Sequence, residues 1–190
     1  MKSRILNSVF CFLFILSVNS FALAFDTGVS QEIIPVSAGG YTTSFLTIPT
    51  ITAGAYSSGY CIGGLQTLSN FNRASGSSGM INAITVSDKA KQSSALAIVF
   101  FNDNPTYTTF TDHAALTIAA ADLNKIVGII QIPAANYQSF ASNSVALVAN
   151  IGMGYVIGGG RTMYFTIICN GTPTYTSVSD LQILITEFQD

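Results

Sequence analysis

The octapeptide SALAIVFF, residues 94–101, decides the fold class, because it is apolar on both faces of an extended chain. A half-buried strand alternates apolar and polar residues, whereas a strand buried on both sides reads as a short continuous apolar run. The flanking segments, DKAKQS before it and NPTYTTFTD after it, carry the polar and turn-forming residues that end a strand. The stretch therefore predicts a central, fully buried β-strand.

Similar short segments occur on both sides of this strand, and each is separated from the next by Gly, Pro, Asn or Ser. Such spacing without alternating helical segments is typical of an antiparallel β-sandwich. We therefore expect an all-β, jelly-roll-like sandwich of about eight strands over residues 51–190. One helical turn is expected at 118–125, and residues 25–50 are expected to form an N-terminal extension. The predicted strands are 43–49, 61–68, 79–87, 94–102, 126–132, 144–151, 162–169 and 181–188.

Residues 1–24 have the layout of a secretory signal peptide. Lys2 and Arg4 precede an apolar run, and Ala22-Leu23-Ala24 supplies the small residues of a cleavage site. We expect the mature chain to start near Phe25 and to be exported to the periplasm, the cell surface or the medium. Loss of Lys2 and Arg4 leaves five of the seven basic residues against nine acidic ones, a net charge of −4.

This charge-poor composition argues against several classes of partner. It provides no basic patch for nucleic acid, and we expect none. Residues 126–160 hold no charge, but polar residues interrupt them, so we expect no transmembrane segment in the mature chain. A zinc site needs several His or Cys ligands, and the mature chain has one His and two Cys. We therefore expect no cofactor and no metal.

The stretch 99–118, VFFNDNPTYTTFTDHAALTI, holds the chain's one histidine, His113, beside Asp112. A hydrolase relying on His113 would need a nucleophile and an orienting acid. Adjacent residues on an extended chain point to opposite faces, so Asp112 is badly placed to orient His113. Asn104-Pro105 is a turn signal. We therefore interpret the stretch as a polar crossing between two strands, in which Asp103 and Asp112 accept nearby backbone N–H groups, those of Asp112 from the alanine-rich segment that follows it.

Cys61 and Cys169 remain after removal of the signal peptide. In an oxidising compartment a disulfide between them would close a loop of more than 100 residues and contribute on the order of 4–5 kcal/mol. The alternative is two small buried hydrophobic residues on separate strands. The sequence leaves both interpretations open.

Several aromatic residues fall in or beside the predicted loops. Exposed tyrosines can stack on sugars or contact another protein, since they offer a large area at low entropic cost. The alternative is that these rings fold back as lids on the ends of the sandwich. The candidate binding residues are Tyr107, Phe110, Tyr137, Tyr155 and Tyr175.

Four segments, in their order along the chain, resemble a group of small tailed-phage virion proteins, described as structural or capsid-decoration components. The segments are GAYSSGYCIGGLQTLSNFNR, GMINAITVSDKAKQSSALAIVFFNDNPT, FTDHAALTIAAADLNKIVGIIQI and NGTPTYTSVSDLQILITEFQD. The resemblance runs from about Ala55 to Asp190, and it departs from the group at Tyr60-Cys61, where an acidic residue is common. It implies a jelly-roll-like sandwich that assembles with its own copies or docks on a lattice, without enzymatic activity.

Together these features predict an exported, non-enzymatic structural or surface-assembly subunit. The expected partner is a second copy of the chain or another surface or lattice protein. The signal peptide favours a bacterial surface or periplasmic protein that has reused the virion module. The alternative is an extracellular module that binds glycans or proteins through its loop tyrosines.

Overall fold

The computed structural model of the protein describes residues 41–189. The predicted signal peptide and residues 25–40 lie outside the described residues. No helix within residues 41–189 has the length and apolarity needed to cross a membrane. The two helical segments there, η1 (Ala120–Lys125) and η2 (Ala134–Asn136), are short 3₁₀ turns.

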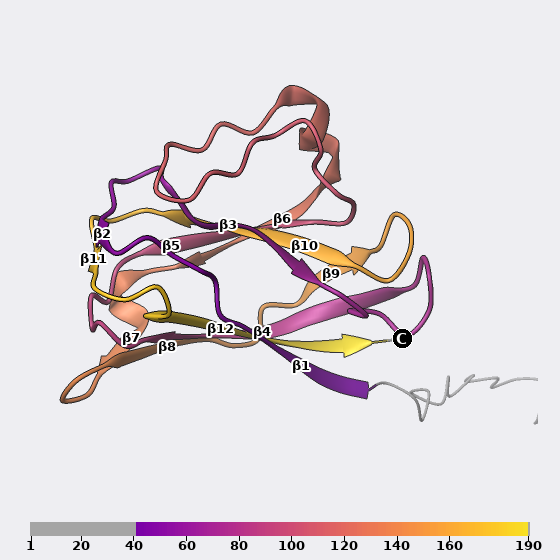
Figure 1. The fold of residues 1–190 in the computed structure, drawn as a ribbon. Helices are drawn as coiled ribbons and strands as arrows, with labels where there is room; N and C mark the ends of the chain where they lie inside the picture. The colour runs from indigo at the N-terminus through magenta and orange to yellow at the C-terminus, as the bar shows by residue number, and fades with distance from the viewer. Residues whose placement is uncertain (1–40, 190) are drawn as a thin grey trace, which may run out of the picture. The chain divides into compact units, whose positions relative to one another are not determined.

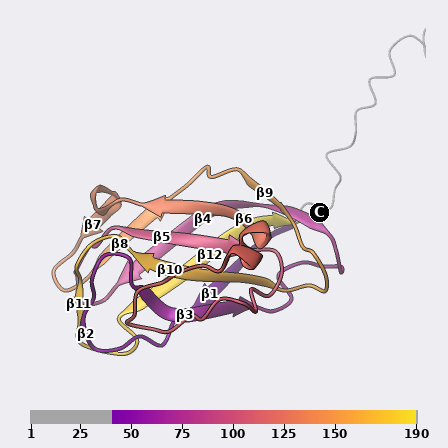
Figure 2. The ribbon, with the colours of Figure 1, turned by 90° about the horizontal axis from the view of Figure 1, so that it is seen from above.

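Two stacked antiparallel sheets form the described part of the chain (Figures 1 and 2). The six-stranded sheet has the order β1-β12-β4-β8-β7, and β9 also pairs with β4. Its strands are β1 (Tyr41–Thr47), β4 (Ser78–Asp88), β7 (Tyr137–Ser139), β8 (Ser144–Val148), β9 (Met153–Val156) and β12 (Leu181–Gln189). The four-stranded sheet has the order β3-β10-β5-β6. Its strands are β3 (Cys61–Leu68), β5 (Leu96–Phe101), β6 (Ile126–Ile132) and β10 (Met163–Cys169). At one end, β2 (Gly54–Ala55) pairs with β11 (Thr174–Tyr175).

The order of the strands is that of a jelly roll. The chain passes from β1 to β3 to β4 to β5, changing sheet at each step, then from β6 to β8 to β10 to β12 in the same way. Among these eight strands, only the step from β5 to β6 stays within one sheet. This interleaving of two Greek keys is the jelly-roll arrangement, so the expected fold class is confirmed.

Alternation along the strands places the core between the sheets. In β12, Leu181, Ile183 and Ile185 are fully buried, and the residues between them are not. In β5, by contrast, all six residues are buried, as SALAIVFF predicts. Leu96, Ile98 and Phe100 join the core cluster between the sheets, so Ala97, Val99 and Phe101 point to the outer side.

Each predicted strand has a counterpart within a few residues, and the helical turn appears as η1. Residues 41–50, which the sequence places in the N-terminal extension, carry β1, which pairs with β12 over its full length. This part of the range therefore belongs to the sandwich. The short strands β2, β7, β9 and β11 lie in segments that the sequence assigns to turns or loops.

Candidate functional site

The long connection between β5 and β6, residues 102–125, covers the outer side of the four-stranded sheet; we call it the crossing (Figures 1 and 2). Beneath it, Val99 and Phe101 of β5 and Thr166 of β10 have no exposed surface, although they point away from the core. The ring of Phe110 in the crossing lies 5.8 Å from that of Phe101, edge to face. The stretch that the sequence predicts as a crossing therefore covers the outer sides of β5 and β10, while Ile129 of β6, on the same side, stays 54% exposed.

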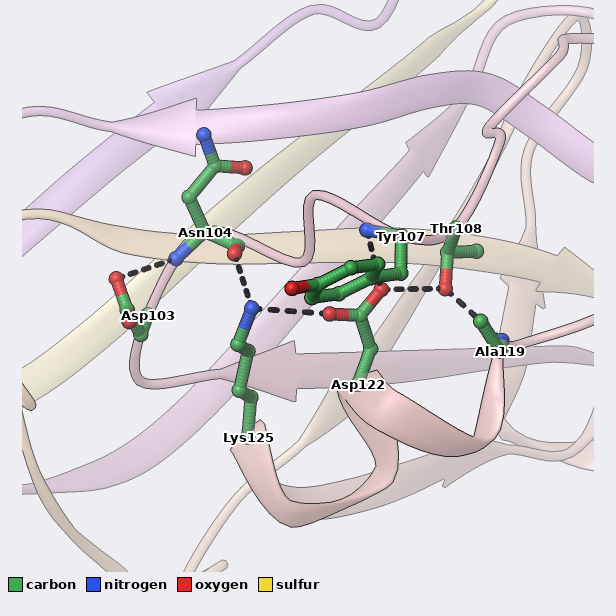
Figure 3. Close-up of polar contacts among 7 residues, drawn as sticks. All are labelled: Asp103, Asn104, Tyr107, Thr108, Ala119, Asp122 and Lys125. Atoms are coloured by element: carbon green, nitrogen blue, oxygen red, sulfur yellow. Dashed lines mark hydrogen bonds and ion pairs between the residues drawn. The ribbon is translucent and has the colours of Figure 1, made fainter.

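Asp122 is one of two carboxylates that hold the crossing (Figure 3). Its Oδ2 accepts hydrogen bonds from the backbone N–H of Tyr107 at 2.9 Å and the hydroxyl of Thr108 at 2.8 Å. Its Oδ1 pairs with the Lys125 ammonium at 2.9 Å, and Lys125 also reaches the Asn104 carbonyl at 2.7 Å. Burial acts to raise the pKa of the Asp122 carboxyl, but these donors outweigh it and hold the pKa below its usual value.

Asp112 is the second anchor, and it ties the crossing to the segment that follows β1. Its Oδ1 accepts from the Tyr56 hydroxyl at 2.8 Å and the backbone N–H of Gly63 at 2.6 Å. Its Oδ2 accepts from the backbone N–H and the hydroxyl of Thr52, at 2.7 and 2.6 Å. Burial opposes ionisation, yet these hydrogen bonds lower the pKa of the Asp112 carboxyl. The carboxylate is therefore fully engaged in binding backbone and hydroxyl donors.

His113 lies beside this anchor without pairing with Asp112. Its Nε2 is 2.8 Å from the carbonyl oxygen of Ala55, and its ring packs between those of Tyr56 and Tyr60, at 4.7 and 5.8 Å. Its backbone is left-handed, with φ of 61°, and lies in a turn, so the chain is not extended at this residue as the sequence interpretation assumed. Its contacts connect the crossing to β2. Within residues 41–189, no three His, Cys, Asp or Glu side chains gather so that they could hold a metal ion.

The five candidate aromatic residues do not gather into one surface. Tyr107 is 71% exposed, while Tyr155 and Tyr175 are almost completely buried. Phe110 and Tyr137 are partly buried. Tyr175 packs edge to face on Tyr56 at 5.7 Å, because it lies on β11 and not in an open loop. Of the five, only Tyr107 presents most of its ring to solvent.

Cys61 and Cys169 are both free thiols, so the disulfide interpretation is corrected. Cys61 is paired with Ile168, and its Sγ lies 3.2 Å from the Thr166 hydroxyl on the outer side of the sheet. Cys169 belongs to the core cluster on the opposite side. Neighbouring residues in a strand point to opposite faces, so the partner of Ile168 cannot meet Cys169. Burial raises the pKa of both thiols.

A buried polar network lies near the end of β12, and the sequence analysis did not predict it. Glu187 has no exposed surface and contacts the Tyr155 hydroxyl and the amide of Gln189, the latter at 2.7 Å. The Tyr155 hydroxyl also lies 2.8 Å from Oδ1 of Asn72. Burial raises the pKa of the Glu187 carboxyl, and its hydrogen bonds offset this only in part. The signal was present, since Glu187 is in phase with Ile183 and Ile185.

The outer side of the six-stranded sheet contrasts with the lidded one. No segment within residues 41–189 passes over it (Figure 1). We call this side the uncovered face. Along each paired strand, its residues are the ones that alternate with the residues buried between the sheets. They are Thr42, Ser44, Leu46, Ser78, Met80, Ala83, Thr85, Ser87, Gln138, Val145, Leu147, Gly154, Val156, Gln182, Leu184, Thr186 and Phe188. Not one of these residues, all within the described range, is charged.

Large and small side chains form separate rows across the uncovered face. One row runs Leu46, Leu184, Thr85 and Leu147 over four strands, and Leu46 and Leu147 are 61% and 57% exposed. The next row holds only Ser44, Thr186 and Ala83. A third row contains Phe188 and Met80. We call the two outer rows ridges and the middle row the trough. The ridges also hold smaller residues, namely Thr85 in the leucine row and Thr42 and Gly154 in the third row.

A pocket borders the far end of this face, where β9 meets β4. It is lined by Ser78, Gly79, Met80, Asn102, Val127, Gly154, Tyr155, Val156 and Phe188. Its wall is predominantly neutral and apolar, and it continues the character of the face beside it.

Comparisons with known proteins give no family. No family model matches the chain, and no curated protein matches it. A structure of tomato aspermy virus has 12% identity and a TM-score of 0.39, over 92% of this chain and 94% of that one. A full particle of Israeli acute paralysis virus has 10% identity and a TM-score of 0.28, over 87% and 76%. A marine algae virus of the order Picornavirales has 12% identity and a TM-score of 0.26, over 85% of this chain and 73% of that one. All three are virus structures, none named as a tailed phage. Likeness at these scores carries no argument, and the fold rests on the strand order above.

Proposed function

We propose that the chain is an exported, non-enzymatic structural subunit that assembles with copies of itself. One observation carries the proposal: the chain covers most of one outer sheet face with its own crossing and leaves the other bare and uncharged. Leu46, Leu147 and Val156 on this bare face are more than half exposed, and exposed apolar side chains gathered on one face mark a surface that meets a partner. Charge is depleted at the centres of protein interfaces, because isolated charges are costly to bury.

The exported location in this proposal rests on the predicted signal peptide of residues 1–24 and on the mildly acidic composition of the remainder. The resemblance to tailed-phage virion proteins supports a lattice-forming or surface-docking role over a free monomer. A bacterial surface or periplasmic protein that has reused such a module fits both features. A lattice protein of another sequence is the alternative partner.

The proposal is tested on the chain from Phe25 onward, by size-exclusion chromatography with light scattering over a dilution series. We expect a mass above that of the monomer at high concentration. Cell fractionation should recover the chain outside the cytoplasm with Phe25 at its N-terminus, and electron microscopy of those cells should show assemblies. A strictly monomeric chain, or one retained in the cytoplasm with its first 24 residues intact, would contradict the proposal.

A second candidate function, binding of a glycan or protein, is favoured by Tyr107 alone. Its ring is 71% exposed, and the Lys125 ammonium lies 5.6 Å from the ring centre, so one side of the ring is held in place. A glycan array tests this with Tyr107→Ala and, as a control, Phe140→Ala, another exposed aromatic residue. Glycan binding that is lost only in Tyr107→Ala would support it, and an array without signal would remove glycan binding.

A further inference from the structure

We infer that two copies of this chain pack their uncovered faces against each other about a two-fold axis. In this pair the Leu46–Leu184–Thr85–Leu147 row of each copy lies over the Ser44–Thr186–Ala83 row of the other. The inference rests on the proposed function and extends it by naming the surface, the partner and the fit.

Because its rows of large and small side chains lie next to each other, the face is complementary in shape to a second copy of itself. In a two-fold contact, residue i of one copy meets residue j of the other, and j meets i. The leucine row and the small-residue row are neighbours, two positions apart along each strand, which is about 7 Å. An axis between the two rows places the ridge of each copy in the trough of the other. Phe188 and Met80 then flank the seam on either side.

The area of the face is close to what a stable pair needs. Five strands at about 4.8 Å spacing, crossed by the nine residues of β12 at about 3.4 Å each, give a plan area on the order of 600 Å². A standard interface buries about 800 Å² per partner, and side-chain relief makes the accessible area larger than the plan area. The face can therefore supply most of an ordinary interface by itself.

Charge also selects a second copy over the chain's own N-terminal segment. A face with one sign of charge would repel its copy across a two-fold contact, and this face has no charge. The segment 25–40, FDTGVSQEIIPVSAGG, contains the large apolar residues Phe25, Val29, Ile33, Ile34 and Val36, but it would also place Asp26 and Glu32 on an uncharged surface. It matches an uncharged face five strands wide less well than the face matches itself.

The test introduces a charge into the leucine row. Leu147→Glu is compared with Leu123→Glu, because the two leucines are 57% and 55% exposed on opposite sides of the sandwich. Each variant is checked for folding by circular dichroism and thermal melting, and its association is measured by sedimentation equilibrium. We expect Leu147→Glu to raise the dissociation constant of the pair on the order of a hundredfold. Leu123→Glu should leave it unchanged.

A second variant tests shape without charge. Ala83→Leu fills the trough, so the opposing ridge can no longer enter it, and we expect a dissociation constant raised about tenfold. Ala120→Leu on η1 is the matched control. If Leu147→Glu fails to fold, Ala83→Leu still tests the inference.

The outcomes separate the inference from the function on which it rests. Association that persists in both Leu147→Glu and Ala83→Leu would overturn the inference and leave self-assembly through another surface. A wild-type chain that stays monomeric would overturn both. If removal of residues 26–40 turned a monomer into a dimer, the N-terminal segment would be the native occupant of the face, and the inference would be wrong.

Discussion

Glu187 is a carboxyl group that the sandwich buries completely among neutral partners. The Tyr155 hydroxyl has a single proton and lies within hydrogen-bonding distance of both Glu187 and Oδ1 of Asn72. The Asn72 amide nitrogen donates to the Ser77 carbonyl at 2.6 Å, so its Oδ1 needs a donor. The hydroxyl cannot give its one proton to both acceptors at once, so its support for an ionised Glu187 is shared with Asn72. Burial raises the pKa of the Glu187 carboxyl, which therefore takes up a proton at a higher pH than in the unfolded chain.

This protonation makes stability depend on pH. The folded-state pKa of Glu187 is raised above the unfolded value of about 4.3. The folded state then holds the extra proton between these two values, so this residue's contribution falls as pH rises through that window. Glu187→Gln keeps the shape and supplies the N–H donor permanently. We expect the variant to be more stable than the wild type at neutral pH.

Urea unfolding of both chains from mildly acidic to neutral pH measures this effect. The difference in unfolding free energy between variant and wild type should grow with pH and then level off. A wild type that gains stability relative to Glu187→Gln as pH rises would show that Glu187 is ionised in the folded chain.

The two cysteines should behave as buried, unreactive thiols. The thiolate is the reactive form, and burial raises the pKa of both groups, Cys61 and Cys169. Without reductant, we expect a maleimide to label neither thiol in the folded chain and both after denaturation. Mass spectrometry of the labelled chain counts them. Labelling that appears only after reduction would demonstrate the disulfide that this geometry opposes.

At the scale of elements, the crossing depends on its two carboxylate anchors. Asp112→Asn leaves one acceptor oxygen where four hydrogen bonds now converge and turns an amide N–H toward existing donors. We expect a loss of about 2 kcal/mol in unfolding free energy, a figure reduced for partial exposure of the site. Hydrogen exchange should accelerate in residues 102–119.

The matched control is Asp103→Asn, because Asp103 is exposed and accepts one local hydrogen bond from the Asn104 N–H. Its stability should stay near that of the wild type. The folded-state pKa of Asp112 is lowered, so its contribution is complete above about pH 3.9 and is lost as pH falls through the folded value. The gap between wild type and Asp112→Asn should therefore close in acid. Equal stability of the two chains at neutral pH would remove the anchoring role.

The elements predicted from sequence are those with a strong local pattern. Alternation in LQILITEF and the unbroken run in SALAIVFF each specify a strand and its buried side. Short strands such as β9 lack this signal, because their glycines also fit a turn. The burial of Tyr155 and Tyr175 could not be predicted either, since it depends on β9 pairing with β4 and β11 with β2.

The candidate site was harder to predict than the fold for the same reason. Asp103 and Asp112 were predicted to accept nearby backbone N–H groups, which is confirmed for Asp103 and wrong for Asp112, whose donors lie 49 to 60 residues away in sequence. The anchoring role of Asp122 was not predicted. The uncovered face becomes visible only when strand order brings Leu46, Leu184 and Leu147 into one row. The local sequence predicts to which side of a strand each side chain points. It does not predict which residue lies beside it on the neighbouring strand.

At the scale of the whole molecule, the sandwich has two unequal outer sides. The crossing gives the four-stranded sheet a lid that covers most of it and has its own hydrogen bonds and ion pair. The six-stranded sheet has no equivalent among residues 41–189. The chain thus uses the 24 residues of the crossing to cover one sheet face. None of its described residues covers the other face.

The absence of charge on the uncovered face predicts how association responds to conditions. Contacts between charged groups weaken as salt screens them, whereas burial of apolar surface does not depend on such screening. We therefore expect the dissociation constant of the pair to change less than about twofold between low and physiological ionic strength. Because apolar burial is entropy-driven near room temperature and lowers the heat capacity, association should strengthen on mild warming. Isothermal dilution calorimetry at two salt concentrations and several temperatures measures both effects. A dissociation constant that rises tenfold with salt would place charged loop residues at the contact, since the face itself has no group that salt could screen.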